Sequence, residues 1–203
     1  MKSIQFNNEV FFPSKVICIG KNYAAHIEEM QSEVPEQPVI FIKPNSAISD
    51  DVLFNEQDRI DYEAEISFLV SDGKYVAVAF GLDLTKRLVQ KKLKTSGLPW
   101  ERAKAFDNSA VFSKFVALDC SLSALRLELW INETLTQSAN YELMLTKPSA
   151  IKDEIESFLT LEDNDVVMTG TPKGVGPIQL GDVFVGRILA NEHLLVEQSW
   201  EVK

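Results

Sequence analysis

Hydrophobic and polar residues alternate along residues 60–70, and this pattern predicts a β-strand with one apolar face. The apolar residues from position 62 to position 68 occupy every second place, so their side chains would point the same way. Asp72 and Gly73 follow as a pair typical of a hairpin turn, and residues 75–84 supply an apolar return strand. The sequence therefore predicts a long β-hairpin in this part of the chain.

The rest of the pattern predicts many strands and few helices. Further strands are expected at residues 16–20, 38–43, 125–131, 135–139, 165–169, 181–189 and 194–202. Helices are expected at residues 23–31, 86–94 and 152–159, and Asn22 and Thr85 stand where N-caps of the first two belong. Strands and helices do not alternate regularly, which argues against a doubly wound sheet. We therefore expect one β-rich α+β domain over residues 1–203.

Composition and net charge limit the kinds of molecule that this protein is expected to bind. With 203 residues, 45% of them hydrophobic, the chain suffices for one well-buried core. Its formal net charge of -10 disfavours nucleic acid, and an acidic small substrate would need local positive charge or a metal ion to bind. No apolar run is long enough to cross a membrane and residues 1–9 do not resemble a signal peptide, so we expect a soluble, cytoplasmic protein. Cys18 and Cys120 lie in apolar runs, where buried reduced thiols are expected.

Three carboxylates stand out on the predicted hairpin. Glu63 and Glu65 would project from the same face of the first strand, and Asp83 follows the apolar run of the second. A buried carboxylate is costly unless it is paired or binds a metal, so the three together suggest an Mg²⁺ or Mn²⁺ site. Zinc is disfavoured because no histidine or cysteine lies nearby in sequence. The alternatives are a solvated strand face for the two glutamates and a helix cap for Asp83 near Thr85.

Other residues are candidates for chemistry, each with a simpler alternative. His26 lies three residues before Glu29, so on a helix the pair could form a general base, or merely an exposed ion pair. Lys104 lies among apolar residues and could hold an anionic intermediate, or reach the surface as ordinary lysines do. The loop over residues 169–176 could bind a carboxylate through its backbone N–H groups, or be a tight turn without a ligand. His193 is expected to be exposed at a hairpin tip.

Several segments, in order over about residues 16–202, resemble the fumarylacetoacetate hydrolase family. They are GKNYAAHIEEM (20–30), PVIFIKP (38–44), DYEAEISFLV (61–70), GLDLT (81–85), GLPWERAKAFDNS (97–109) and TGTPKGVGP (169–177). Within that family the chain looks most like the short, single-domain acylpyruvase and oxaloacetate decarboxylase branch. The resemblance implies the β-rich mixed-sheet roll of the family's C-terminal domain, and a homodimer.

The resemblance also implies roles for particular residues. It assigns Mg²⁺ or Mn²⁺ to Glu63, Glu65 and Asp83, a His–Glu pair in a mobile lid to His26 and Glu29, and the catalytic lysine to Lys104. The substrate-binding residues that it implies are Lys21, Asn22, Arg87, Gln90, Gly170 and Thr171. Lys86, Leu88 and the pair Ser67–Phe68 depart from the family's usual residues, which leaves the substrate preference open.

The expected function is a metal-dependent hydrolase that cleaves a C–C bond of an acylpyruvate and releases a pyruvate enolate. Decarboxylation of oxaloacetate or isomerisation of an unsaturated 2-hydroxy diacid are alternatives, because the same site serves all three reactions in the family. Two non-enzymatic alternatives are a metal-binding family member without catalysis and a ligand-binding module without metal. In each enzymatic case the partner is a small 2-oxo acid.

Overall fold

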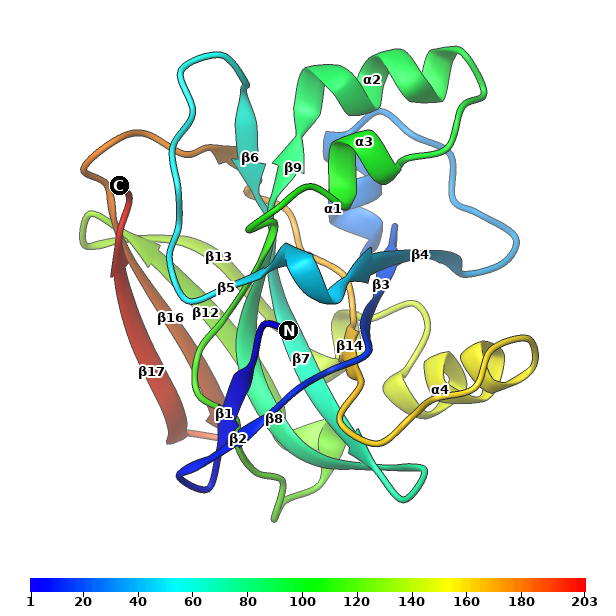
Figure 1. The fold of residues 1–203 in the computed structure, drawn as a ribbon, viewed down its shortest axis with the longest axis vertical. Coiled ribbons are helices and arrows are strands. Elements are labelled where there is room, and N and C mark those ends of the chain that lie inside the picture. The colour runs from blue at the N-terminus through cyan, green and yellow to red at the C-terminus, as the bar shows by residue number, and fades with distance from the viewer.

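Seventeen β-strands and four short α-helices make up the computed structural model, which describes all residues 1–203 (Figure 1). The strands are β1 Ile4–Phe6, β2 Glu9–Phe11, β3 Lys15–Gly20, β4 Val39–Pro44, β5 Ile48–Ser49, β6 Ile60–Tyr62, β7 Ala64–Ser71, β8 Lys74–Asp83, β9 Thr85–Lys86, β10 Ala110–Phe112, β11 Val116–Ala117, β12 Leu125–Ile131, β13 Thr134–Asn140, β14 Val166–Met168, β15 Gly176–Pro177, β16 Val183–Ala190 and β17 His193–Glu201. The α-helices are α1 Ala24–Glu29, α2 Arg87–Thr95, α3 Glu101–Lys104 and α4 Pro148–Glu156, and three short 3₁₀ helices cover Asn45–Ala47, Leu122–Ala124 and Tyr141–Leu143. The predicted β-rich α+β class is confirmed.

A mixed sheet forms the centre of the fold. Its strands run in the order β4-β3-β14-β7-β8-β10-β5, and β11 pairs with β8 beside β10. Two pairs are parallel, β3 with β14 and β5 with β10, and the other pairs are antiparallel. A second sheet, β13-β12-β16-β17, packs across β7 and β8. Helices α1, α2 and α3 gather at one end of the central sheet, and α4 lies apart from them (Figure 1).

The main core lies between the central sheet and the second sheet. The apolar face predicted for residues 62–68 is confirmed, because all four of its side chains join this core: Tyr62, Ala64, Ile66 and Phe68. Leu69, on the opposite face of β7, is buried in a second core. Both faces of β7 are therefore covered, and a solvated strand face for the two glutamates is excluded.

The predicted hairpin exists, but its first strand is interrupted. Asp72 and Gly73 both have positive φ angles, 48° and 64°, as a two-residue hairpin turn requires. Residues 60–70 were expected to form one strand, whereas β6 ends at Tyr62 and β7 begins at Ala64. The reason is that β6 pairs with β9 and β15 in a small separate sheet, while β7 pairs with β8 and β14.

Two predicted helix caps are wrong. Asn22 does not cap α1, because its side-chain amide donates to the carbonyl oxygens of Thr146 and Thr169, 3.0 Å and 2.8 Å away. Thr85 forms part of strand β9, and α2 begins only at Arg87. In both places a tertiary contact replaces the local cap that the sequence favours.

Other expectations differ in detail. The helix expected at residues 152–159 begins four residues earlier, where Pro148 provides a suitable first helical residue. Cys18 is buried as expected, whereas Cys120 is partly exposed. His193 is exposed, as predicted. No helix is long and apolar enough to cross a membrane.

The contact between the two large sheets leads to a test of packing. Gly186 in β16 faces the buried ring of Phe80 in β8, and a Cβ atom at Gly186 would lie 2.4 Å from that ring. Gly186→Ala should therefore lower the free energy of unfolding by about 1–3 kcal/mol, the usual cost of overpacking a core. Gly20→Ala is the control, because a Cβ there would meet Val39 at an ordinary 3.5 Å. Equal urea midpoints for the two variants would contradict this account.

Candidate metal centre and active site

Three buried carboxylates converge where the small sheet meets the central sheet. Glu63 occupies the break between β6 and β7, Glu65 lies on β7, and Asp83 ends β8. One oxygen from each lies within 4.8 Å of the others, and the residues are only 5%, 1% and 1% exposed. The backbone N–H of Asp83 donates to the carbonyl oxygen of Glu63 at 2.8 Å, which ties the two strands together at this point. Asp83 is therefore not a helix cap.

The donor set fits a divalent cation that prefers oxygen ligands. Burial and the negative charges of Asp83 and Glu63 raise the pKa of Glu65 well above its usual value. A cation among the three oxygens would relieve both effects, whereas zinc would favour nitrogen or sulfur ligands. Glu63, Glu65 and Asp83 are thus the residues that could hold Mg²⁺ or Mn²⁺.

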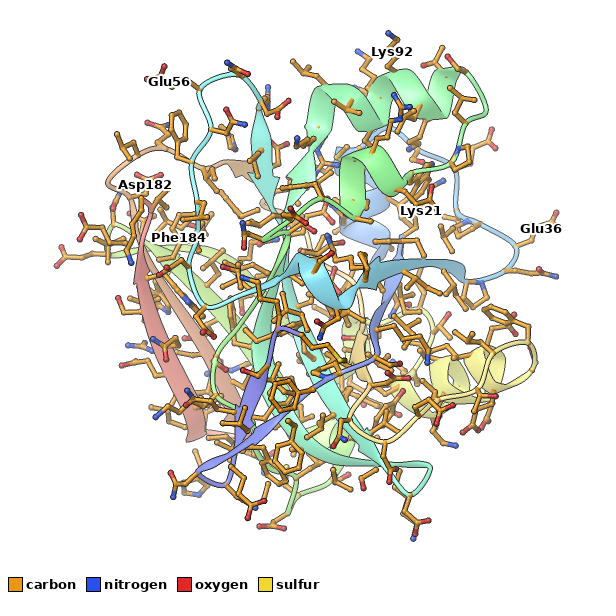
Figure 2. The ribbon with its side chains drawn as sticks, in the orientation of Figure 1. Lys21, Glu36, Glu56, Lys92, Asp182 and Phe184 are labelled. Carbon is orange, nitrogen blue, oxygen red and sulfur yellow. The ribbon has the colours of Figure 1, made fainter.

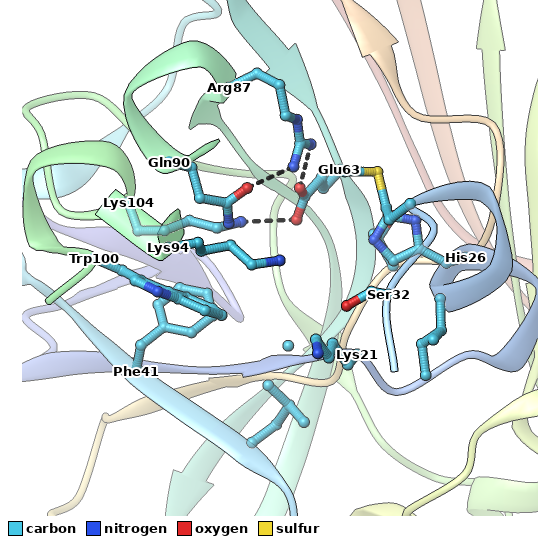
Figure 3. Close-up of a pocket in the computed structure, with 15 residues that line it drawn as sticks. Lys21, His26, Ser32, Phe41, Glu63, Arg87, Gln90, Lys94, Trp100 and Lys104 are labelled. Atoms are coloured by element: carbon cyan, nitrogen blue, oxygen red, sulfur yellow. Dashed lines mark hydrogen bonds and ion pairs between the residues drawn. The ribbon is translucent and has the colours of Figure 1, made fainter. Parts of the chain in front are cut away.

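Lys104 neutralises part of the negative charge of the three carboxylates. It lies at the end of α3, a short helix that the sequence pattern did not predict, and it is buried. Its ammonium lies 2.8 Å from Glu63 Oε2 (Figure 3) and 2.7 Å from Asp83 Oδ2. Burial alone would lower the pKa of Lys104, but the charges of Asp83 and Glu63 outweigh it and raise that pKa. Lys104 is therefore a fixed positive charge, and the surface-lysine alternative is excluded.

Arg87 holds the other side of Glu63. Its Nη2 atom lies 2.5 Å from Glu63 Oε1, and its Nη1 atom donates to Gln90 Oε1 at 2.8 Å. Its Nε atom binds Asp61 at 2.8 Å. Although burial would raise the pKa of Glu63, the charges of Lys104 and Arg87 outweigh it and lower that pKa. Glu63 is therefore ionised, and Arg87 and Gln90 line the cavity above it.

The loop after β14 supports Glu65. The backbone N–H of Gly170 donates to Glu65 Oε2 at 2.7 Å, so this donor is already used inside the protein. Gly170 has a φ of 95°, and a Cβ there would lie 2.8 Å from the Cβ of Asn22. Thr171 is buried and lines the cavity, whereas Asn22 does not line it and its side-chain amide bonds to backbone. Asn22 and Gly170 thus support the loop that carries Thr171.

Helix α1 closes over the cavity. His26 is buried and faces the cavity (Figure 3), and its Nδ1 atom lies 3.2 Å from Glu29 Oε2. The other oxygen of Glu29 accepts a hydrogen bond from the backbone N–H of Gly174 at 3.0 Å. Lys21, at the start of this segment, donates to the carbonyl oxygen of Glu33 at 3.0 Å. The predicted His–Glu pair is therefore present and is fastened to the glycine-rich loop.

Sequence reasoning missed three charged residues of this region. Lys43 is fully buried, and its ammonium lies 2.8 Å from Asp83 Oδ1 and 2.9 Å from Ser109 Oγ. Asp61 is buried between Arg87 and Arg59, and Lys94 reaches the cavity from α2. The one available sign was a lysine inside the apolar run PVIFIK, where a buried charge needs a partner.

Comparisons with known proteins agree with this geometry. The family model described as fumarylacetoacetate (FAA) hydrolase C-terminal matches residues 15–195. The oxaloacetate tautomerase YcgM of Escherichia coli is 40% identical over 187 residues, which cover 83% of this chain and 85% of that protein. The mitochondrial oxaloacetate tautomerase oaa1 of Schizosaccharomyces pombe is 34% identical over 212 residues, 93% of this chain and 95% of that protein.

A solved structure adds a ligand to the comparison. The fumarylpyruvate hydrolase of Pseudomonas aeruginosa, in complex with Mn²⁺ and pyruvate, has a TM-score of 0.89 at 26% identity. The match covers 98% of this chain and 94% of that one. That relative therefore has the same fold over nearly its whole length.

Removing one carboxylate tests the metal centre. Glu65→Gln keeps an acceptor for Gly170 but removes a charge from the cluster. The affinity of this variant for Mn²⁺ should fall by more than ~10–100-fold, the loss typical when a residue that only supports a metal ligand is substituted. Glu28→Gln, on the exposed side of α1, is the control and should bind Mn²⁺ as the wild type does. Titration followed by electron paramagnetic resonance measures both, and unchanged affinity in Glu65→Gln would exclude Glu65 as a ligand.

The raised pKa of Glu65 predicts a pH effect in metal-free protein. A folded-state pKa above the unfolded value means that the folded state binds this proton more tightly. The contribution of Glu65 to stability is therefore lost as the pH rises from about 4.5 through its folded pKa. With EDTA present, Glu65→Gln should gain stability relative to the wild type over that rise. Melting temperatures at stepped pH measure the difference, and a constant or shrinking difference would refute the prediction.

Proposed function

Because this chain belongs to the fumarylacetoacetate hydrolase family, we propose that it is a metal-dependent enzyme acting on a small, enolisable 2-oxo acid. The observation that carries the proposal is the convergence of Glu63, Glu65 and Asp83 beside a cavity lined by cationic side chains. Mg²⁺ or Mn²⁺, when bound there, would act as a Lewis acid toward the carboxylate and 2-oxygen of the substrate.

The first candidate reaction is the keto–enol tautomerisation of oxaloacetate. The relatives at 40% and 34% identity are named for this activity. The conversion of enol to ketone removes a proton from the 2-oxygen and adds a proton at C3, so it needs a group that can both accept and donate a proton. The C2–C3 double bond becomes single and the C2–O bond becomes double, but no C–C or C–O bond is broken and no attacking water is required.

His26 is the group best suited to move that proton. Its Nδ1 atom faces the carboxylate of Glu29, so Nδ1 carries the hydrogen and Nε2 is left to exchange a proton with the substrate. Glu29 holds the ring in this orientation, and the bond from Gly174 holds Glu29. Lys104 stays protonated, so it stabilises negative charge on the enolate oxygen rather than removing protons.

The hydrolysis of an acylpyruvate is the second candidate. The same Nε2 atom of His26 could take a proton from water, which then attacks the 4-carbonyl and breaks the C3–C4 bond. The fumarylpyruvate hydrolase structure with pyruvate favours this reaction. Decarboxylation of oxaloacetate leads to the same enolate by loss of CO₂ and needs no attacking water. Lys104 and Arg87 would serve all three reactions alike.

We also propose that the protein is a homodimer, as the family resemblance implies. Sedimentation velocity tests this at micromolar concentration. A species with twice the mass of one chain is expected, and a single-chain species would refute it.

His26 separates the proton-transfer step from metal binding. His26→Ala should lower kcat for oxaloacetate tautomerisation by about 10²–10⁴-fold while the affinity for Mn²⁺ stays unchanged. His193→Ala is the matched control, because His193 is the other histidine and is exposed on β17. The absorbance of enol-oxaloacetate reports the reaction, and an EDTA-treated sample reports its dependence on metal. Equal loss of activity and metal binding in His26→Ala would overturn the assigned role.

The same protein sample distinguishes the candidate reactions. Loss of enol absorbance without pyruvate release would support tautomerisation. Metal-dependent loss of acetylpyruvate absorbance would support hydrolysis instead, and pyruvate released from oxaloacetate would support decarboxylation. Absence of all three with Mn²⁺ bound would favour a metal-binding protein without catalysis.

A further inference from the structure

Two lysines on the cavity have no acidic partner. The other basic residues that line it, Arg87 and Lys104, are both ion-paired with Glu63. Lys94, on α2, has no carboxylate oxygen within 4.0 Å, and its ammonium extends into the cavity (Figure 3). Lys21 binds only the carbonyl oxygen of Glu33. In a protein with a net charge of -10, unpaired cations at a cavity are available to an incoming anion.

The position of Lys94 makes it suited to bind a ligand. It lies at the mouth, exposed to solvent, with its ammonium 5.8 Å from the centre of the Trp100 ring. Partial burial, and then the charges of Lys21 and Arg87, lower the pKa of Lys94. The positive charges therefore crowd one another, and an anion among them would relieve the repulsion.

The balance of buried positive and negative charges in the site indicates how many negative charges the ligand should carry. The four buried carboxylates here, Glu63, Glu65, Asp83 and Asp61, are matched by four cations. These are Lys43, Arg87, Lys104 and the more exposed Arg59. A divalent ion bound by the first three carboxylates would add a surplus of two positive charges. A dianion suits that surplus better than a monoanion, and one of its carboxylates can extend toward the mouth.

We propose that Lys94, with Lys21 beside it, binds the second carboxylate of the substrate and so selects 2-oxo dicarboxylic acids over monocarboxylic ones. The inference rests on the proposed function, in which the metal end of the cavity takes the 2-oxo acid group. Lys94 is thereby a specificity-determining residue that does not touch the reacting atoms. Acylpyruvates with an uncharged acyl group would gain nothing from it.

Two stable 2-hydroxy acids test the proposal without turnover. L-malate and L-lactate share the carboxylate and 2-oxygen but differ in the distal carboxylate. Calorimetric titration of the Mn²⁺-loaded protein should show malate binding about 10–100-fold more tightly than lactate, the value of a charged hydrogen bond. Lys94→Gln should weaken malate binding by that factor and leave lactate binding unchanged. Lys94→Arg keeps the charge and should retain most of the preference.

Lys92→Gln is the matched control. Lys92 lies on the same helix, loses the same charge on substitution, and points away from the cavity (Figure 2). The preference of the Lys92→Gln variant for malate over lactate should equal that of the wild type. Equal weakening of malate and lactate in Lys94→Gln, or no weakening of either, would overturn the proposal, and so would a wild type that binds both acids alike.

The titration is independent of the reaction. If the wild type turns over neither oxaloacetate nor acetylpyruvate but its preference for malate depends on Lys94, the specificity inference stands and the proposed function fails. If oxaloacetate is turned over but the preference does not depend on Lys94, the proposed function stands and the inference fails.

Discussion

The structure depends on the charge balance around three buried carboxylates. An ionised group removed from water loses several kcal/mol of solvation unless partners replace the water. Here the partners come from separate elements: Lys43 from β4, Arg87 from α2 and Lys104 from α3. The fold must therefore bring these elements to one point before the carboxylates can be buried.

The strand break at Glu63 is part of the same arrangement. A continuous strand would hold residues 60–70 in one sheet, whereas the break lets β6 pair with β9 and brings Asp61 beside Arg87. The side chain of Gln137, from the second sheet, accepts the N–H of Ala64 at 3.0 Å and so satisfies the backbone beside the break. The site lies where the sheets meet because only there can donors from several elements reach it.

The sequence predicted what depends on local pattern and missed what depends on distant partners. The alternation over residues 60–70 predicted both the core face and the convergence of Glu63 with Glu65. It could not predict that Lys43 would meet Asp83, because the partners are far apart in sequence and a lysine inside an apolar run does not show which carboxylate it will meet. Asn22 looked like a helix cap for the same reason, since its real partners follow more than 120 residues later.

Some charged residues at this site are paired with the buried carboxylates and others are not. This difference helps to explain how one fold can serve several reactions. Lys43, Arg87 and Lys104 cannot change easily, because the loss of any one leaves the buried carboxylates with one positive charge too few. His26 and Lys94 are free of that constraint: His26 lies on α1 and Lys94 lies on α2 at the mouth of the cavity. In the proposed function, changes at these two positions would alter proton transfer or substrate choice and leave the ion pairs of the buried cluster in place. In the proposed function, reaction and substrate are therefore set by residues around the carboxylate cluster, and the shared enolate chemistry by the cluster and the metal that it would hold.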